Sequence, residues 1–226
     1  MSLAHAFHHQ LELLTVANAT PMIFAIVDDI SVRNSLEALI HSEGWEVETF
    51  ASAREFLARP RPLVPSCLIL ALSLSDQTSL EVQKQLSRER AEVPIVVISG
   101  HADIPTTVRA MKAGAVDFLL NPFSDAVLLE AIRESLERSR RTLDREMATR
   151  DARNRYESLS RRERQVMSLV VSGLLNKQVG GELGISEVTV KAHRGQVMQK
   201  MKANTLADLM RMAAQLKPSL QAVHVA

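Results

Sequence analysis

Residues 176–201 read NKQVGGELGISEVTVKAHRGQVMQKM, and this stretch decides the fold of the C-terminal part of the chain. The triplet Gly184-Ile185-Ser186 separates two segments of helical spacing. Glycine commonly follows the end of a helix and serine commonly caps the start of one, which predicts one helix over 176–183 and a second to about Met201. Two helices joined by so short a turn form a helix-turn-helix, whose second helix enters the major groove of DNA.

Two further helices flank this pair. Ser160 and Glu163 have the spacing of a capping box, which predicts a helix that ends at Gly173. A last helix opens between Thr205 and Asp208, and we expect it to end before Pro218 because proline breaks the hydrogen-bond ladder of a helix. The pattern predicts an all-α domain of four helices over residues 158–226.

The second helix of the pair has two unlike faces. A projection at about 100° per residue places Val190, His193, Val197 and Met201 on one side, where we expect them to pack against the other helices. The opposite side carries small side chains flanked by a lysine. Such a face suits close approach to base edges, because methyl groups contact thymine and lysine reaches guanine or a phosphate. Arg194 lies nearer the packed side, and its long stem can still extend outward. The predicted DNA contacts are Lys177, Val188, Thr189, Lys191, Ala192, Arg194, Gly195 and Gln199.

Short apolar runs alternate with helical stretches in the first part of the chain. The runs cover residues 22–27, 45–50, 67–72, 94–99 and 116–120. This alternation predicts an α/β domain over 21–137, preceded by an N-terminal extension over 1–20, with a doubly wound sheet of five parallel strands. In such a sheet the functional site lies outside the C-terminal ends of the strands. Those ends carry Asp28-Asp29, Ala71, Ser99-Gly100-His101 and Asn121-Pro122.

Both halves resemble one protein family. The segment LSRRERQVMSLVVSGLLNKQVGGELGISEVTVKAHRGQVMQKMKA resembles the LuxR-type DNA-binding domain of NarL/FixJ response regulators, a likeness that covers about 159–216. The residues that carry it are Glu163, Gly173, Asn176-Lys177, Gly184-Ile185-Ser186, Thr189-Val190-Lys191 and His193. Residues 22–137 resemble the receiver domain of the same regulators, which has a flavodoxin-like fold. The resemblance implies a transcription regulator that binds double-stranded DNA.

The resemblance assigns roles to residues at the predicted strand ends. Asp28 and Asp29 match the acidic pair that helps to hold Mg²⁺, and Ser99 matches the hydroxyl residue that contacts the phosphoryl group. Phe118 matches the aromatic switch position. Asn121-Pro122-Phe123 falls on a Lys-Pro-Phe motif whose proline bond is typically cis.

Two departures from the receiver pattern change the expected chemistry. Ala71 occupies the position of the aspartate that accepts phosphate, and Asn121 replaces the lysine. The turn that follows the acceptor is also altered, to Leu74-Ser75-Asp76. An alanine methyl group cannot form an acyl phosphate and supplies no oxygen ligand, so Asp28 and Asp29 would hold Mg²⁺ only weakly. We expect no cofactor and control without phosphorylation, by a regulatory protein or a small ligand at the receiver.

Other chemistries fit the sequence less well. Recruitment of Ser73 or Asp76 as an acceptor would require the turn to refold. Aspartyl phosphatases of this fold need Asp-x-Asp after the first strand, whereas this chain has adjacent aspartates, so we do not expect an enzyme. A zinc site at His5, His8 and His9 would need further ligands, and a solvated N-terminal helix is the favoured interpretation.

Composition and charge agree with this division. The chain has 226 residues, 46% of them hydrophobic and 23% charged, which is typical of globular domains. Residues 1–132 hold 9 Lys and Arg against 16 Asp and Glu, a net charge of −7, whereas residues 133–226 hold 18 against 10, a net charge of +8. A basic second part is typical of a nucleic-acid-binding domain. The single cysteine, Cys67, and the lack of a signal peptide or an apolar run of membrane-spanning length predict a soluble cytoplasmic protein.

The sequence offers two surfaces through which two copies of the chain could pair. A helix from near Ser124 to about Tyr156 includes a predicted linker over 138–157. It carries a stripe of Leu129, Ile132, Leu136, Leu143 and Met147. Because one helix-turn-helix reads few base pairs, we expect a homodimer at least on DNA, formed through this stripe or through the switch face near Phe118. The alternative function is a non-DNA-binding interaction protein whose degenerate receiver sequesters a partner.

Overall fold

The computed structural model describes residues 19–61, 63–72, 77–100 and 103–221. The chain divides into two compact units after Asp144. Several residues named above lie outside the described residues and are not discussed structurally: His5, His8, His9, Ser73, Leu74-Ser75-Asp76 and His101. No helix in the described ranges combines the length and the hydropathy that are needed to cross a membrane.

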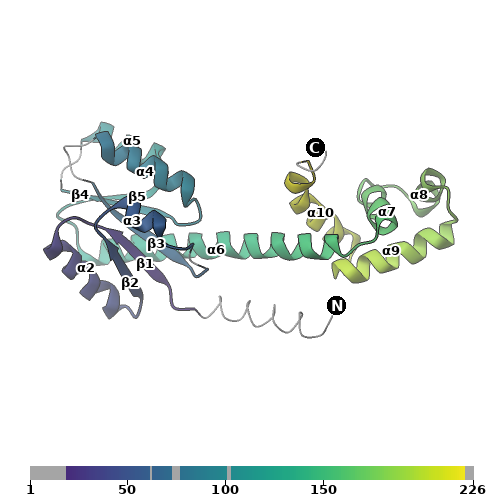
Figure 1. The fold of residues 1–226 in the computed structure, drawn as a ribbon, viewed down its shortest axis with the longest axis horizontal. Coiled ribbons are helices and arrows are strands. Elements are labelled where there is room, and N and C mark those ends of the chain that lie inside the picture. Colours follow the sequence, from purple (N-terminus) through teal and green to yellow (C-terminus); the bar gives the residue numbers. More distant parts are fainter. Residues whose placement is uncertain (1–18, 62, 73–76, 101–102, 222–226) are drawn as a thin grey trace. The chain divides into compact units, whose positions relative to one another are not determined.

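The first unit is built on one parallel sheet (Figure 1). Its strands are β1 (Met22–Ile26), β2 (Glu46–Phe50), β3 (Ser66–Leu72), β4 (Ile95–Ser99) and β5 (Ala115–Leu120). Their spatial order is β2-β1-β3-β4-β5, with β1 and β3 in the interior of the sheet. This arrangement confirms the predicted five-stranded α/β fold. It brings the C-terminal ends of β1 and β3 side by side, because Ile26 pairs with Leu70 across the two strands.

Helices cover both faces of this sheet. They are α2 (Ile30–Ser42), α3 (Ala53–Ala58), α4 (Gln77–Glu89), α5 (Ile104–Lys112) and the first part of α6 (Asp125–Glu157). Because side chains alternate along a strand, Ile23 and Ala25 pack in one core with α2 and α6. Phe24 and Ile26 pack in a second core with α3 and α4. Ala71 is half-buried against the α2–α6 core.

The second unit consists of helices packed around one core. It contains the end of α6, α7 (Arg161–Val171), α8 (Asn176–Leu183), α9 (Glu187–Met201) and α10 (Leu206–Gln221). The predicted capping box is formed, since the Ser160 side chain accepts from the Glu163 amide and the Glu163 side chain accepts from the Ser160 amide. Gly184 ends α8 with φ of 65°, a left-handed conformation that favours glycine. Ser186 caps α9 by accepting from the Thr189 amide, as the sequence predicts.

Two sequence-based expectations are wrong. Helix α10 continues through Pro218 to Gln221 instead of ending before the proline, which sacrifices one amide donor near the helix end but leaves the preceding turns intact. The apolar stripe on α6 is not the open face that a dimer contact would need, because Leu129, Ile132, Leu136 and Leu143 are 8%, 0%, 7% and 5% exposed and only Met147 is half-buried. Ile132 and Leu136 belong to the core beneath the sheet, so the periodicity of this helix reports packing within one chain.

Candidate DNA-binding surface and receiver pocket

Helix α9 presents the face that the projection predicts to be free. Val190, Val197 and Met201 are at most 1% exposed, and His193 is half-buried. The predicted contact residues are exposed with the exception of Arg194, which is partly buried: Lys177, Val188, Thr189, Lys191, Ala192, Gly195 and Gln199. Val188 is 76% exposed, so its methyl groups are open to contact from outside the domain.

Gly195 leaves the backbone of α9 open to close approach. A Cβ atom built on this glycine meets no heavy atom within 4 Å, so nothing within the protein requires the absence of a side chain there. Glycine in the interior of a helix costs about 1 kcal/mol relative to alanine. A glycine at this exposed position therefore suits a surface where a ligand comes near the helix backbone.

Two basic residues of α9 are held by neighbouring polar groups. The Lys191 ammonium lies 3.5 Å from a Glu187 carboxylate oxygen, one turn earlier on the same face. Arg194 donates from Nη1 to Asn176 Oδ1 at 3.1 Å, which joins α9 to the first residue of α8. Lys177 follows that asparagine and is exposed. The sequence projection does not reveal the contact between Arg194 and Asn176, because it joins residues on two helices.

Charged contacts also hold the C-terminal end of α9. Lys200 donates to both Glu163 carboxylate oxygens, at 2.9 and 2.7 Å, and links this end of the helix to the first turn of α7. Glu163 is only 6% exposed. The Lys200 hydrogen bond lowers the pKa of Glu163, burial opposes that shift, and the Ser160 amide lowers the pKa further. Arg155 of α6 donates to the carbonyl of Met201, the last residue of α9, at 3.2 Å.

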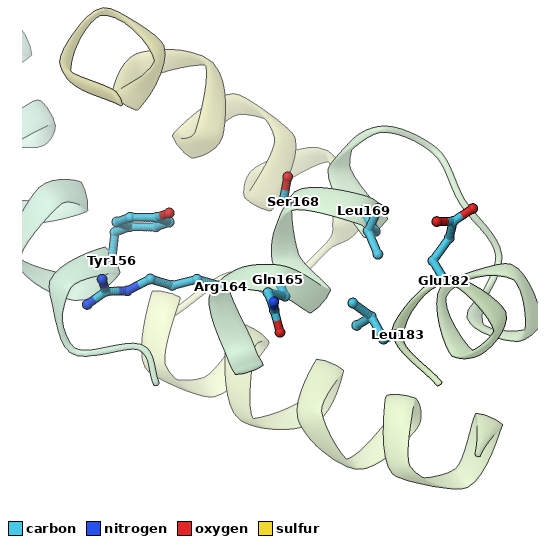
Figure 2. A pocket seen from close by; sticks show the side chains of 7 residues that line it. All are labelled: Tyr156, Arg164, Gln165, Ser168, Leu169, Glu182 and Leu183. Atoms are coloured by element: carbon cyan, nitrogen blue, oxygen red, sulfur yellow. The ribbon is translucent and has the colours of Figure 1, made fainter. Parts of the chain in front are cut away.

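A groove of about 380 Å³ lies on the second unit between α6, α7 and α8 (Figure 2). Figure 2 shows the Arg164 side chain running alongside the Tyr156 ring, and the guanidinium carbon lies 5.3 Å from the ring centroid. Leu169 and Leu183 line the groove on the side next to Glu182, and Gln165 and Ser168 lie between them and Tyr156. None of the predicted DNA contacts lines this groove, and the sequence analysis did not identify it.

The acidic pair of the first unit lies at the C-terminal end of β1. Asp29 caps α2 through Oδ1, which accepts from the amides of Ser31 and Val32 at 2.7 and 3.1 Å and from the Ser31 hydroxyl at 2.6 Å. The Ser31 hydroxyl, followed by the two amides, lowers the pKa of Asp29. Asp28 Oδ1 accepts from the Asp29 amide at 3.0 Å. Both side chains are exposed, so their free oxygens face solvent.

The ends of β3, β4 and β5 supply little further chemistry. Ser99 is 4% exposed, and its hydroxyl donates to the carbonyl of Leu72 at 3.3 Å. The backbone N–H of Asn121 donates to the Ser99 carbonyl at 2.8 Å, and the peptide bond between Asn121 and Pro122 is cis. Phe118 is half-buried against the core formed with α3 and α4.

These residues do not fit a resident magnesium ion. Magnesium requires octahedral oxygen coordination and is usually held by carboxylates together with phosphate oxygens. The Ala71 side chain supplies no oxygen, and one Asp29 oxygen already accepts three hydrogen bonds. Within the described ranges no three His, Cys, Asp or Glu side chains are grouped as metal ligands.

Comparison with known proteins shows the family to which this chain belongs. The chain matches the model of the response regulator receiver domain over residues 23–133, and the model of bacterial regulatory proteins of the luxR family over residues 157–213. Nodulation protein W of Bradyrhizobium diazoefficiens is 48% identical over 202 residues, which cover 89% of each chain. The chain belongs to the NarL/FixJ family of response regulators. Response regulator protein TodT of Pseudomonas putida is 42% identical over 212 residues, covering 94% of this chain and 93% of TodT.

Solved structures agree with this assignment. The response regulator StyR is 43% identical, with a TM-score of 0.74, and the match covers 87% of this chain and all of StyR. Full-length FixJ from B. japonicum is 36% identical, with a TM-score of 0.50, over 86% of this chain and 96% of FixJ. This response regulator is thus a DNA-binding transcription factor with a receiver domain and a LuxR-type helix-turn-helix.

Proposed function

We propose that this response regulator controls transcription without aspartyl phosphorylation. The observation that carries the proposal is Ala71, which stands at the end of β3 on the α2–α6 side of the sheet. An acyl phosphate forms only on a carboxylate, and the methyl group of alanine offers no nucleophile. The two states of the receiver then differ in population because of a regulatory protein or a small ligand, not because of a phosphoryl group.

The rest of the pocket supports this proposal. Asn121 is exposed, and its amide side chain has neither the charge nor the reach of the lysine found in phosphorylated receivers. The buried Ser99 hydroxyl donates to a carbonyl of β3. Asp29 caps α2, a structural role that is independent of any phosphoryl group. The residues retained at this site therefore have roles in holding the fold.

Intact mass spectrometry tests the proposal. The full-length protein is incubated with acetyl phosphate and Mg²⁺, and we expect its mass to remain unchanged. The double variant Ala71→Asp, Asn121→Lys restores the acceptor and the cation at one site and should gain one base-labile phosphoryl group. A stable acyl phosphate on the wild-type protein would show that another carboxylate serves as acceptor and would refute the proposal.

We further propose that α9 reads DNA through the exposed residues described above. Val188 and Ala192 offer methyl groups for thymine contacts, and Lys191 is placed to donate to guanine or to a phosphate. Lys177 is placed for a phosphate contact at the start of α8, next to Asn176. In this proposal the receiver covers 21–137, a linker 138–157 and the DNA-binding domain 158–226.

A titration on operator DNA tests this surface. Gly195→Glu adds bulk and negative charge to the open face of α9 and should abolish binding, whereas Lys191→Ala should weaken it. Ala214→Glu places the same charge at an exposed position on α10 and serves as the matched control. Wild-type affinity in the Gly195→Glu protein would contradict the proposal. Affinity that does not fall with salt would favour the alternative of a non-DNA-binding interaction protein.

We also propose a homodimer formed through the switch face of the receiver. Ile104, Val108 and Met111 lie at i, i+4 and i+7 on α5 and are 82%, 44% and 43% exposed. Leu120, at the end of the neighbouring strand β5, is 48% exposed. The variant Val108→Glu, Met111→Glu should weaken cooperative binding to two half-sites and leave binding to one half-site unchanged. Equal losses on both DNAs would contradict this interface.

A further inference from the structure

A cleft of about 230 Å³ opens beside the former phosphorylation pocket, between α2 and the start of α6. Its floor includes Leu36, Ile98 and Leu128, which are 5%, 3% and 1% exposed. Ile98 is the β4 residue that pairs with Ala71 of β3, and both side chains lie on the α2–α6 face of the sheet. A carboxylate at position 71 would place a charge next to this floor, whereas the alanine methyl group leaves it apolar.

The size of the cleft limits what it can hold. An apolar cavity of about 150 Å³ is known to accommodate one benzene molecule. The present cleft therefore has room for a single ring with a short substituent, about ten non-hydrogen atoms. Its apolar floor favours an aromatic or alicyclic body over a polar one.

Polar groups at the edge of the cleft define the other end of such a ligand. Ser31 and Ser35 of α2 contribute hydroxyl groups, and Asn121 contributes an amide. Asp125 is exposed on the first turn of α6, and Asp28 and Asp29 follow β1 near the start of α2. These carboxylates disfavour an anionic ligand through Coulomb repulsion. The Ser31 and Ser35 hydroxyls donate to Asp29 Oδ1 and to the Ser31 carbonyl, so they can accept a hydrogen bond from an alcohol, while the Asn121 side-chain amide can donate or accept one.

The cleft is also placed to affect the output of the protein. Asp125 and Leu128, two of its lining residues, lie in the first turn of α6. That helix runs to Glu157 without glycine or proline, and its last turns belong to the core of the DNA-binding unit through Ala152. A ligand that binds more tightly when the first turn of α6 takes one of two positions relative to α2 would increase the population of the receiver state that has this position.

We propose that this cleft is a binding site for a small uncharged organic molecule, a single ring that carries a hydroxyl group. This inference rests on the proposed function, because the ligand takes the place of phosphorylation as the signal. For a ligand of this size we expect a dissociation constant of about 0.1 to 1 mM. In this site the ring packs against the side chains of Leu36, Ile98 and Leu128. The ligand hydroxyl lies toward Ser31, Ser35 and Asn121.

Methyl NMR of the full-length protein tests the inference with benzyl alcohol as the probe. The methyl resonances of Leu36, Ile98 and Leu128 should shift saturably. Benzoate, which has the same ring but a carboxylate, should bind at least five times more weakly. Ser35→Phe fills the cleft from an exposed position on α2 and should abolish the shifts. Ala38→Phe adds the same side chain at an exposed α2 position outside the cleft lining and should leave binding unchanged.

Each outcome bears on the inference. Saturable shifts that disappear in Ser35→Phe and persist in Ala38→Phe support it, and an equal midpoint of thermal unfolding in both variants shows that the fold is retained. Absence of saturable shifts in the wild-type protein, or identical binding by both variants, overturns the site. Equal affinity for benzoate overturns the ligand class. Because the titration contains no phosphodonor, its failure leaves the mass-spectrometry test of phosphorylation-independent control unaffected.

Discussion

Replacement of Lys200 by methionine should destabilise the DNA-binding unit through the charge that it leaves behind. In the native protein the Glu163 side chain is 8% exposed, and its carboxylate accepts hydrogen bonds from Lys200 at 2.7 and 2.9 Å. Lys200→Met keeps the side chain as far as Cε but removes this cation. Breaking a buried ion pair from one side costs about 3–5 kcal/mol. The Lys200 side chain is itself 36% exposed, so water can partly replace it, and we expect a loss of about 2–3 kcal/mol.

The double variant separates charge from packing. Glutamine at position 163 can retain the capping box with Ser160, because the motif accepts Glu or Gln at that position. Glu163→Gln, Lys200→Met therefore removes the uncompensated carboxylate but keeps the helix cap. We expect its free energy of unfolding to lie within about 1 kcal/mol of the wild-type value, since a buried ion pair replaced on both sides is often close to neutral.

Urea unfolding followed by two probes measures these effects. Trp45, the single tryptophan of the chain, packs in the first unit, so its fluorescence reports that unit. Far-ultraviolet circular dichroism follows the helices of both units. Lys200→Met should lower the midpoint of the helical transition and leave the Trp45 transition unchanged. A double variant that is less stable than Lys200→Met would refute the reasoning, as would an unchanged helical transition in the single variant.

The same pair predicts how stability depends on pH. The pKa of Glu163 is lower in the folded protein than its ordinary value of 4.5, with the Lys200 hydrogen bond as the main cause. A lowered folded-state pKa means that the stabilisation is present above pH 4.5 and is lost as the pH falls through the folded-state pKa. The difference in unfolding free energy between wild type and Glu163→Gln should therefore shrink as the pH is lowered below that value.

Three further predictions concern individual positions. A Cβ on Gly180 would lie 2.7 Å from the Ile185 carbonyl oxygen, whereas one on Gly181 meets nothing within 4 Å. In thermal denaturation, Gly180→Val should therefore lower the free energy of unfolding of the second unit by about 2–4 kcal/mol more than Gly181→Val does. Burial raises the pKa of the Cys67 thiol to about 12, so iodoacetamide should label Cys67 only in urea; rapid labelling of the native protein would contradict its burial. Leu136→Glu places a charge in the α2–α6 core and should abolish the Trp45 transition, whereas Arg138→Glu, at an exposed position of the same helix, should leave it intact.

Local sequence signals predict the elements of this protein well because each signal acts within a few residues. Ser160 with Glu163, Gly184 and Ser186 satisfy or end the backbone ladder of their own helices, so the boundaries of α7, α8 and α9 follow from the sequence. The near-continuous apolar runs at β3 and β4 likewise report burial on both faces of a parallel sheet. The free face of α9 follows from helical period alone.

Longer-range properties required the tertiary structure. The stripe on α6 has the period of a helix with one apolar face, and that period is the same whether the face meets a second copy or the chain's own sheet. The packing of Ile132 and Leu136 against the sheet decides between these possibilities. The continuation of α10 through Pro218 likewise departs from what a local rule predicts.

The sequence by itself determined the two-unit plan and the order of the elements, because these depend on residue identity and on spacing along the chain. Only the tertiary structure decided which distant groups meet. Lys200 reaches Glu163 across 37 positions, Arg194 reaches Asn176 across 18, and Ile98 shares a cleft with residues of α2 and α6. Such contacts depend on how helices and strands pack in three dimensions, and hydrophobic burial is non-directional, so periodicity specifies that a face is covered but not which residues cover it.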